Sequence, residues 1–141
     1  MRILADTSVW SLALRRDDVS SDATVTFLRQ ALWQGESVFS TGLILQELLQ
    51  GFGGPKDRGK ILARFAGMPL IVPRREDHIG AADLRNDCRR RGVQIDTVDV
   101  LLAQLCIAHD LTMLTTDQDF THLARHAPLK LWHGSTPNTP P

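Results

Sequence analysis

The sequence predicts an α/β fold with a five-stranded, mainly parallel sheet that is flanked by helices on both faces. Two observations support this prediction. Short apolar runs alternate with longer segments of helical periodicity along nearly the whole chain, which is the pattern of strand–helix–strand units. The chain has 141 residues, of which 43% are hydrophobic and 23% are charged, so its size and composition are those of one globular domain.

The first 40 residues contain two predicted strands and two predicted helices. The apolar run at residues 2–5 predicts a strand that ends at an aspartate. Ser8 is expected to cap a short helix over residues 8–14. Apolar side chains at helical spacing predict a longer helix over about residues 22–34, and residues 37–40 predict the second strand.

The middle of the chain continues this alternation. Residues 41–51 predict a helix that ends at a glycine. Pro55 is well placed at the first position of the next helix, over residues 55–66. Residues 69–72 predict the third strand, and residues 76–91 predict an amphipathic helix with a strongly basic end.

The last third contains the most apolar helix of the chain. Residues 97–109 are apolar on nearly all sides, so we expect this helix to be buried. Residues 112–115 and 129–132 predict the last two strands, on either side of a helix over residues 118–126. The tail at residues 134–141 contains only Gly, Ser, Thr, Pro and Asn, which predicts disorder.

The composition excludes several classes of protein. We expect residues 1–133 to form the single domain, and no apolar run reaches the roughly 18 residues that a membrane span needs. The beginning of the chain lacks the apolar segment and cleavage site of a signal peptide. Cys88 and Cys106 form neither a disulfide framework nor a C-x-x-C metal pair. We therefore expect a soluble, cytoplasmic protein.

Acidic residues follow two of the predicted strands. Asp6 ends the first strand, and Asp117 and Asp119 come directly after the fourth. Open parallel sheets bind ligands at the carboxyl ends of their strands, where the strand order reverses, so these acids meet if the two strands are neighbours there. Capping of a helix or turn is the better explanation for Asp6 and for Asp117 when each is considered alone.

Two further acids lie on apolar helices. Glu47 has Leu48 and Leu49 beside it, and Asp99 lies near the start of the helix that we expect to be buried. An unpaired buried carboxylate costs several kcal/mol, so Asp99 needs an arginine, a helix N-terminus or a shared cation. A shared hard cation such as Mg²⁺ or Mn²⁺, which takes oxygen ligands, is the most economical explanation for the whole set of acids.

Other chemical motifs are weaker or absent. His122 and His126 are four residues apart but lack the glutamate of a zincin helix, which favours surface histidines. The sequence contains neither a G-x-S-x-G nucleophile elbow nor a G-x-x-x-x-G-K-[ST] phosphate loop. We expect Trp10, Trp33 and Trp132 to fill a core or an interface.

Four segments together resemble the PIN domain family and, more narrowly, the VapC toxins of VapBC toxin–antitoxin pairs. The resemblance covers residues 1 to about 132, and the segments have the order and spacing of the family. They are ADTSVW at residues 5–10, QELLQG at residues 46–51, TVDVLLAQLCIAHDL at residues 97–111 and LTTDQDF at residues 114–120. The resemblance implies a PIN-like fold and a metal-dependent endoribonuclease.

The resemblance also implies the residues of the site. The implied catalytic residues are Asp6, Glu47, Asp99 and Asp117. The implied metal ligands are Asp6, Asp99, Asp117 and Asp119, while Glu47 is either a ligand or the group that orients the attacking water. The candidate hydroxyl contacts to the scissile phosphate are Thr7, Ser8 and Thr116.

One carboxylate departs from the family pattern. Asp96 lies three residues before Asp99, so both share one face of a helix. We prefer the interpretation that Asp96 caps this helix, and the alternative is that it contacts the water shell of the ion.

The implied cofactor is Mg²⁺, with Mn²⁺ as an alternative. The implied partners are an RNA substrate, with tRNA as the first choice, a VapB-type antitoxin and a second copy of the chain. The resemblance implies that the chain contacts DNA only indirectly, through the antitoxin, and that it contacts no membrane. RNA cleavage by such a toxin inhibits translation and growth.

Two other functions remain open. The first is a catalytically silent PIN-fold binding module, which the complete set of acids disfavours. The second is a receiver-like domain that is phosphorylated on Asp6 or Asp117. The second function normally needs a lysine near the phosphate, and the three lysines lie in or beside other segments.

The charge balance fits a nuclease only after the acids are divided into two groups. The chain has 16 basic and 16 acidic residues, and a net charge of zero disfavours nucleic-acid binding. Setting the five site acids aside leaves 11 acidic against 16 basic residues, a surplus of about 5 positive charges. The arginine runs at residues 15–16, 74–75 and 89–91 are the candidate contacts to the nucleic-acid backbone.

Overall fold

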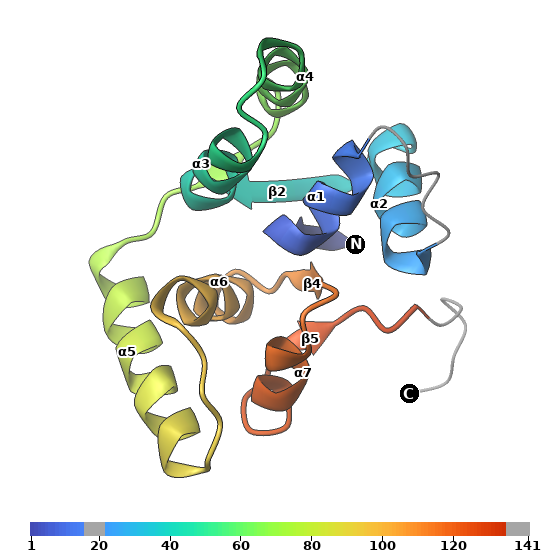
Figure 1. The fold of residues 1–141 in the computed structure, drawn as a ribbon. Coiled ribbons are helices and arrows are strands. Elements are labelled where there is room, and N and C mark those ends of the chain that lie inside the picture. The colour runs from blue at the N-terminus through green and yellow to red at the C-terminus, as the bar shows by residue number, and fades with distance from the viewer. Residues whose placement is uncertain (16–21, 135–141) are drawn as a thin grey trace.

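A five-stranded parallel sheet forms the centre of the molecule (Figure 1). The computed structural model describes residues 1–15 and 22–134, so nearly all of the predicted tail at residues 134–141 lies outside the described residues. The order of the strands across the sheet is β3-β2-β1-β4-β5. The strands are β1 (Arg2–Ala5), β2 (Ser37–Thr41), β3 (Leu70–Ile71), β4 (Thr112–Leu114) and β5 (Lys130–Leu131).

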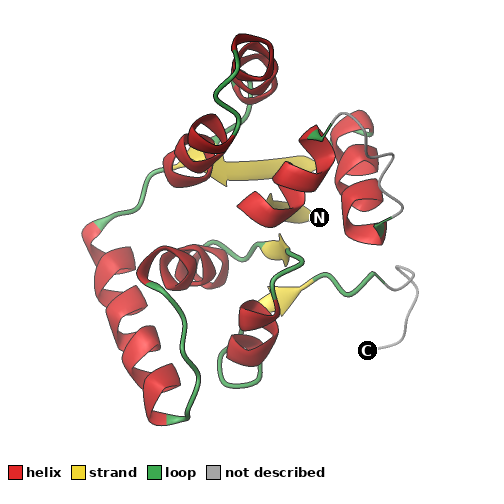
Figure 2. Cartoon of the chain, viewed as in Figure 1, coloured by secondary structure: helices red, strands yellow, loops and turns green. Residues whose placement is uncertain are grey.

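Helices connect the strands, as the alternating pattern predicts (Figure 2). The described residues contain α1 (Thr7–Leu14), α2 (Ala23–Trp33), α3 (Gly42–Gly51), α4 (Pro55–Phe65), α5 (Arg75–Arg90), α6 (Thr97–Ala108) and α7 (Gln118–Ala124). Pro55 is the first residue of α4, where its missing N–H costs no hydrogen bond. Within the described part of the chain, no helix is both long and apolar enough to cross a bilayer.

The predicted cap of the first helix is wrong. Asp6, and not Ser8, is the N-cap of α1, since its carboxylate accepts a hydrogen bond from the Val9 N–H at 3.2 Å. Asp6 follows β1 directly and keeps an extended backbone, which is the conformation that lets an N-cap side chain reach the third residue of the helix. Ser8 therefore lies inside the first turn of α1.

The central strand is covered on both of its faces. Ile3, Leu4 and Ala5 are all fully buried. Because successive side chains of a strand point to opposite faces, burial of all three means that helices cover both sides of the sheet. Helix α6 is also buried as expected, with Leu102 and Leu105 at most 1% exposed.

The three tryptophans differ in their surroundings. Trp10 is buried and lies against Phe65 of α4, with ring centroids 5.0 Å apart. Trp132 is half-buried and stacks on Phe27 of α2 at 4.5 Å. Trp33 is 91% exposed at the last residue of α2, so it does not fill the core of this chain, and its place in an interface stays a prediction.

The strand order reverses at β1, and this reversal places the functional end of the sheet. β2 and β3 lie on one side of β1, whereas β4 and β5 lie on the other. Ala5 is in register with Leu114, and the Asp6 N–H donates to the Leu114 carbonyl at 3.0 Å. The carboxyl ends of β1 and β4 are therefore neighbours at the switch point, as the acid pattern requires.

Candidate active site

Asp6 is a buried carboxylate at the end of β1, with only 4% of the residue exposed. One of its oxygens accepts hydrogen bonds from the Ser8 hydroxyl at 2.6 Å and from the Val9 N–H, and the other accepts one from the Thr115 hydroxyl. Burial raises the pKa of the Asp6 carboxyl, and these three donors oppose the rise. Asp6 is thus held in one orientation from both sides of the switch point.

Two hydroxyl groups connect the ends of β1 and β4. The Thr115 oxygen donates to Asp6 and accepts the N–H of Asp117 at 2.9 Å. The Ser8 oxygen donates to Asp6 and accepts the N–H of Thr116 at 3.1 Å. The backbone before α7 is therefore tied directly to the Asp6 carboxylate.

Thr115 is a site residue that the sequence analysis missed. Its neighbour Thr116 was the predicted residue, and the side chain of Thr116 is exposed. The strand register puts Thr115 opposite Asp6, one position beyond the Ala5–Leu114 pair. A search for hydroxyl groups at the ends of both predicted strands would have included Thr115.

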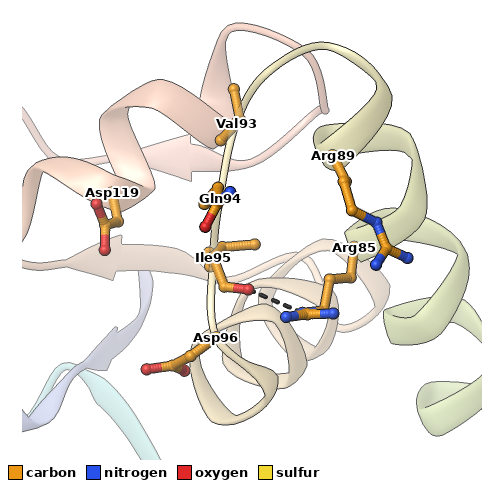
Figure 3. Close-up of a pocket in the computed structure, with 7 residues that line it drawn as sticks. All are labelled: Arg85, Arg89, Val93, Gln94, Ile95, Asp96 and Asp119. Atoms are coloured by element: carbon orange, nitrogen blue, oxygen red, sulfur yellow. Dashed lines mark hydrogen bonds between the residues drawn. The ribbon is translucent and has the colours of Figure 1, made fainter.

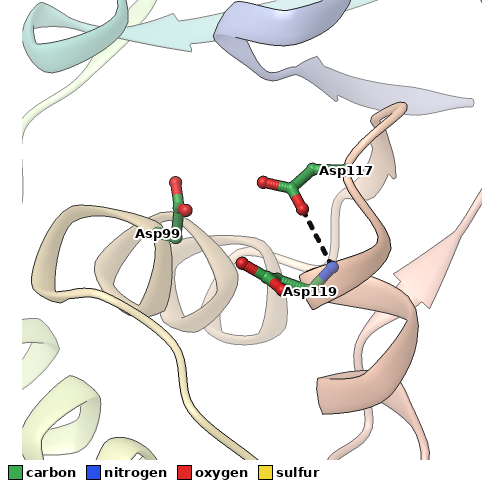
Figure 4. A group of neighbouring side chains, drawn as sticks. All are labelled: Asp99, Asp117 and Asp119. Carbon is green, nitrogen blue, oxygen red and sulfur yellow. Dashed lines mark hydrogen bonds between the residues drawn. The ribbon is translucent and has the colours of Figure 1, made fainter.

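Three aspartates, Asp99, Asp117 and Asp119, converge on one another (Figure 4), and the charges of Asp99 and Asp117 interact with that of Asp6. Asp99 lies in the first turn of α6, and Asp117 and Asp119 lie at the start of α7. Each offers a carboxylate oxygen, and these oxygens lie within 4.8 Å of one another. Asp117 is also the N-cap of α7, because its side chain accepts the Asp119 N–H at 2.9 Å.

Asp99 is partly buried and lies in the negative field of other carboxylates. Burial and the negative charges of Asp96, Asp117, Asp6 and Glu47 raise the pKa of the Asp99 carboxyl from 3.8 to about 7. The influence of four other carboxylates on Asp99 shows that acids from distant parts of the sequence share one site.

Glu47 and Asp96 stand at the edge of this cluster. Glu47 is exposed on α3, and the Thr7 hydroxyl donates to it at 2.8 Å, so α1 and α3 meet beside the site. Asp96 is the N-cap of α6 and accepts the Asp99 N–H at 2.8 Å, which confirms the preferred interpretation of this residue.

The donor set suits a hard divalent cation. In the described ranges 1–15 and 22–134, the ion pairs are Met1–Glu36, Asp87–Arg90 and Asp110–Lys130, so no basic side chain neutralises the clustered acids. Carboxylate oxygens are the ligands that Mg²⁺ and Mn²⁺ favour. Asp99, Asp117 and Asp119 could hold such an ion, and Asp6 is fixed next to them.

Comparison with known proteins identifies the family. The family model described as the PIN domain matches residues 3–126 of the chain. The chain belongs to the PIN domain family. The resemblance of the four sequence segments to this family is therefore confirmed, and the strand order above is that of a PIN fold.

Several solved structures share the fold of this PIN domain. VapBC2 from Rickettsia felis, bound to a DNA fragment from the promoter, is 18% identical with a TM-score of 0.71, covering 94% of this chain and 98% of that chain. FitAcB from Neisseria gonorrhoeae is 23% identical with a TM-score of 0.70, covering 94% and 97%. VapBC-1 from nontypeable Haemophilus influenzae is 14% identical with a TM-score of 0.71, covering 95% and 98%. No curated protein matches the chain in sequence.

Proposed function

We propose that this PIN domain is a Mg²⁺-dependent endoribonuclease, with Mn²⁺ as an alternative ion, and the toxin of a VapBC-type toxin–antitoxin pair. The observation that carries the proposal is the convergence of carboxylates at the switch point without a basic partner among the described residues. Membership of the PIN family supports nuclease activity, because PIN domains are generally nucleases. The likeness in fold to VapBC and FitAcB supports the toxin role.

The surroundings of each side chain suggest its role in the reaction. Asp99, Asp117 and Asp119 would hold the ion, and Asp6 would complete the ligand set directly or through water. When bound, a divalent ion supplies an activated water at neutral pH and stabilises charge on the phosphodiester oxygens. Glu47, whose carboxylate accepts the Thr7 hydroxyl, would be either a further ligand or the group that orients the attacking water.

Hydroxyl and amide groups near the acids are the candidate contacts to the scissile phosphate. The Ser8 and Thr7 hydroxyls already donate to Asp6 and Glu47, so in this structure their hydrogens point to carboxylates. The exposed Thr116 side chain is therefore the first choice among the three predicted residues. The substrate we place first is tRNA, whose cleavage would stop translation and growth.

The antitoxin partner follows from the same likeness. VapBC2 and VapBC-1 are toxin–antitoxin complexes that share this fold. We expect this chain to form a homodimer, to bind a VapB-type antitoxin, and to contact operator DNA only through that antitoxin. Expression of the chain alone should arrest growth, and co-expression with the product of a small neighbouring reading frame should restore it.

RNA cleavage by the purified full chain tests the nuclease proposal. The wild type should cleave structured RNA in Mg²⁺ and not in EDTA. Asp6→Asn and Asp99→Asn should each lower the cleavage rate by about 100-fold or more, because each removes a charge that the site needs. Asp83→Asn, an exposed acid of α5, is the matched control and should cleave like the wild type.

The same experiment separates the alternatives. Full cleavage by both site variants would contradict the proposed roles of Asp6 and Asp99. RNA binding without any cleavage would favour a silent binding module instead. Circular dichroism and thermal unfolding of each variant would show that a lost activity does not come from a lost fold.

A further inference from the structure

A pocket with a volume of about 390 Å³ adjoins the acidic cluster (Figure 3). Asp96 and Asp119, which belong to the cluster or to its edge, lie on one side. Arg85 and Arg89 of α5 lie on the other side, and the loop residues 93–95 run between the two sides. A volume of this size lies at the lower end of the range for small-ligand sites, so it has room for about one nucleotide unit.

The Arg85 side chain is held in one position beside the pocket. It is half-buried, and its Nε donates to the carbonyl of Ile95, another lining residue, at 2.9 Å (Figure 3). This bond fixes the plane of the guanidinium group and leaves its two terminal nitrogens without an ion pair in the part of the chain that the structure describes. A guanidinium group held in one plane is suited to binding a phosphate through two hydrogen bonds.

Arg89 lies one helical turn after Arg85 and on the same face of α5. Among the residues that the structure describes, its guanidinium donates to the side-chain oxygen of Asn86, which is a neutral partner. Arg90, the next residue, instead pairs with the carboxylate of Asp87 and does not line the pocket. Positive side chains near the C-terminus of a helix interact favourably with the helix dipole. This effect is the same for Arg89 and Arg90, so it does not explain why Arg85 and Arg89 both line this pocket.

The charges on the two sides of the pocket suit one kind of ligand. A free anion would be repelled by Asp96 and Asp119, whereas a polyanion that reaches the cluster can place its next charge against the arginines. RNA has this arrangement, since each phosphate is followed by another one nucleotide away.

We propose that this pocket binds the RNA phosphate next to the scissile bond, through Arg85 and Arg89. The inference rests on the proposed nuclease function and names the route by which the strand leaves the cluster. Arg85 and Arg89 are then substrate-positioning residues, and they set binding of the strand without taking part in the chemistry.

RNA binding and cleavage by the full chain test this pocket. Binding of a labelled RNA is measured by fluorescence anisotropy against KCl concentration, in the Asp6→Asn background with Mg²⁺. Arg89→Gln should weaken binding by about 5- to 10-fold and lower the slope of log affinity against log salt by roughly 0.7–1, as expected for one lost phosphate contact. In the active chain, Arg89→Gln should raise KM by a similar factor with kcat within about twofold.

Arg64→Gln is the matched control, because it removes the same charge from an exposed position in the last turn of another helix, α4. It should change binding and KM by less than about twofold, since Arg64 does not line the pocket. Arg85→Lys keeps the charge but loses the planar group and its bond to Ile95, so it should lie between the wild type and Arg89→Gln. Because lysine keeps the charge and most of the side-chain length, Arg85→Lys should also fold at this half-buried position.

The outcomes distinguish the pocket from the nuclease activity. If Arg89→Gln and Arg64→Gln have equal effects, or neither has one, the pocket proposal is overturned even where the wild type cleaves RNA. If the wild type cleaves no RNA but Arg89→Gln still weakens binding selectively, the nuclease proposal fails and the pocket stands. A chain that binds no RNA at all overturns both.

Discussion

Single aspartates in this PIN domain stabilise a helix and form the site at the same time. Asp6, Asp96 and Asp117 are the N-caps of α1, α6 and α7. A cap uses only part of a carboxylate, which has about four lone-pair positions, so the same group can still face the cluster. Capping and site formation, which are competing explanations in the sequence, are therefore compatible at Asp6 and Asp117.

The charge of Asp99 should destabilise the metal-free fold. The pKa of the Asp99 carboxyl is about 7 in the folded state, which is above its unfolded value of 3.8. Its contribution to the free energy of unfolding is therefore fully present below about pH 4 and is lost as the pH rises through 7. In EDTA at pH 8, Asp99→Asn should raise the free energy of unfolding by about 1–2 kcal/mol, a value discounted because the carboxyl is half-buried. Urea unfolding at pH 8 and pH 4 measures this difference, which should vanish at pH 4. An Asp99→Asn variant less stable than the wild type at pH 8 would contradict the field described above.

The Thr115 hydroxyl should position Asp6 and Asp117 together. Thr115→Val keeps the shape of the side chain and removes the bonds to the Asp6 carboxylate and the Asp117 N–H. We expect a stability loss of about 1 kcal/mol and a fall in kcat of about 10-fold or more. Thr115→Ser keeps the hydroxyl and should restore most of kcat, which a purely structural role in packing would not require. Equal kcat values for the valine and serine variants would refute this role.

At the scale of elements, the site depends on helices that approach one another closely. The bond from Thr7 to Glu47 joins α1 to α3, and α6 packs along α5. Gly80 of α5 faces Gln104 of α6, and a Cβ atom at Gly80 would lie 2.6 Å from the Gln104 amide nitrogen. A side chain at Gly80 would therefore displace the Gln104 side chain at the contact between the two helices that carry Arg85 and Asp99.

Substitution of Gly80 should reveal this contact. Gly80→Ala gains about 1 kcal/mol of helix propensity but forces the Gln104 amide aside, so its net effect on stability should be near zero. In the Gln104→Ala background the clash is gone, and Gly80→Ala should then stabilise by about 1 kcal/mol. Gly80→Leu should destabilise by about 1–3 kcal/mol through overpacking. Denaturant unfolding of this double-mutant cycle measures the coupling, and strict additivity would mean that the contact has no energetic weight.

At the scale of the whole molecule, the fold holds together acids that repel one another. The five predicted site acids come from the residue after β1, from α3 and α6, and from the start of α7, and they converge at the carboxyl ends of the central strands. A protein with a net charge of zero can therefore have a strongly negative site on an otherwise basic body.

A divalent ion should stabilise the whole fold by relieving this repulsion. At a Mg²⁺ concentration about 100 times the dissociation constant, binding adds roughly 2.7 kcal/mol, which corresponds to a rise in Tm of about 5–10 °C for a domain of this size. The Asp99→Asn/Asp117→Asn double variant should lose this rise. Thermal unfolding in MgCl₂, against KCl of equal ionic strength, measures the effect. A rise that persists in the double variant would place the ion elsewhere.

The sequence by itself determined the kind of fold, the approximate position of each strand and helix, and the acidic residues. These features are local, because a side-chain period of two or 3.6 residues reports which face of an element is buried. The match of residues 97–109 to the buried helix α6 is an example. Segment resemblance added the family, since the four motifs keep the order and spacing of the PIN domain.

Only the tertiary structure decided which residues touch across the site. The Thr115 hydroxyl reaches an acid 109 positions away, because the register of β1 and β4 places the two opposite each other. Arg85 faces the site only through the packing of α5 beside the loop that leads into α6. Strand order and register depend on how whole elements pack, and no local period encodes them. The identities of the acids were therefore readable from the sequence, whereas the residues that orient them and the pocket beside them were not.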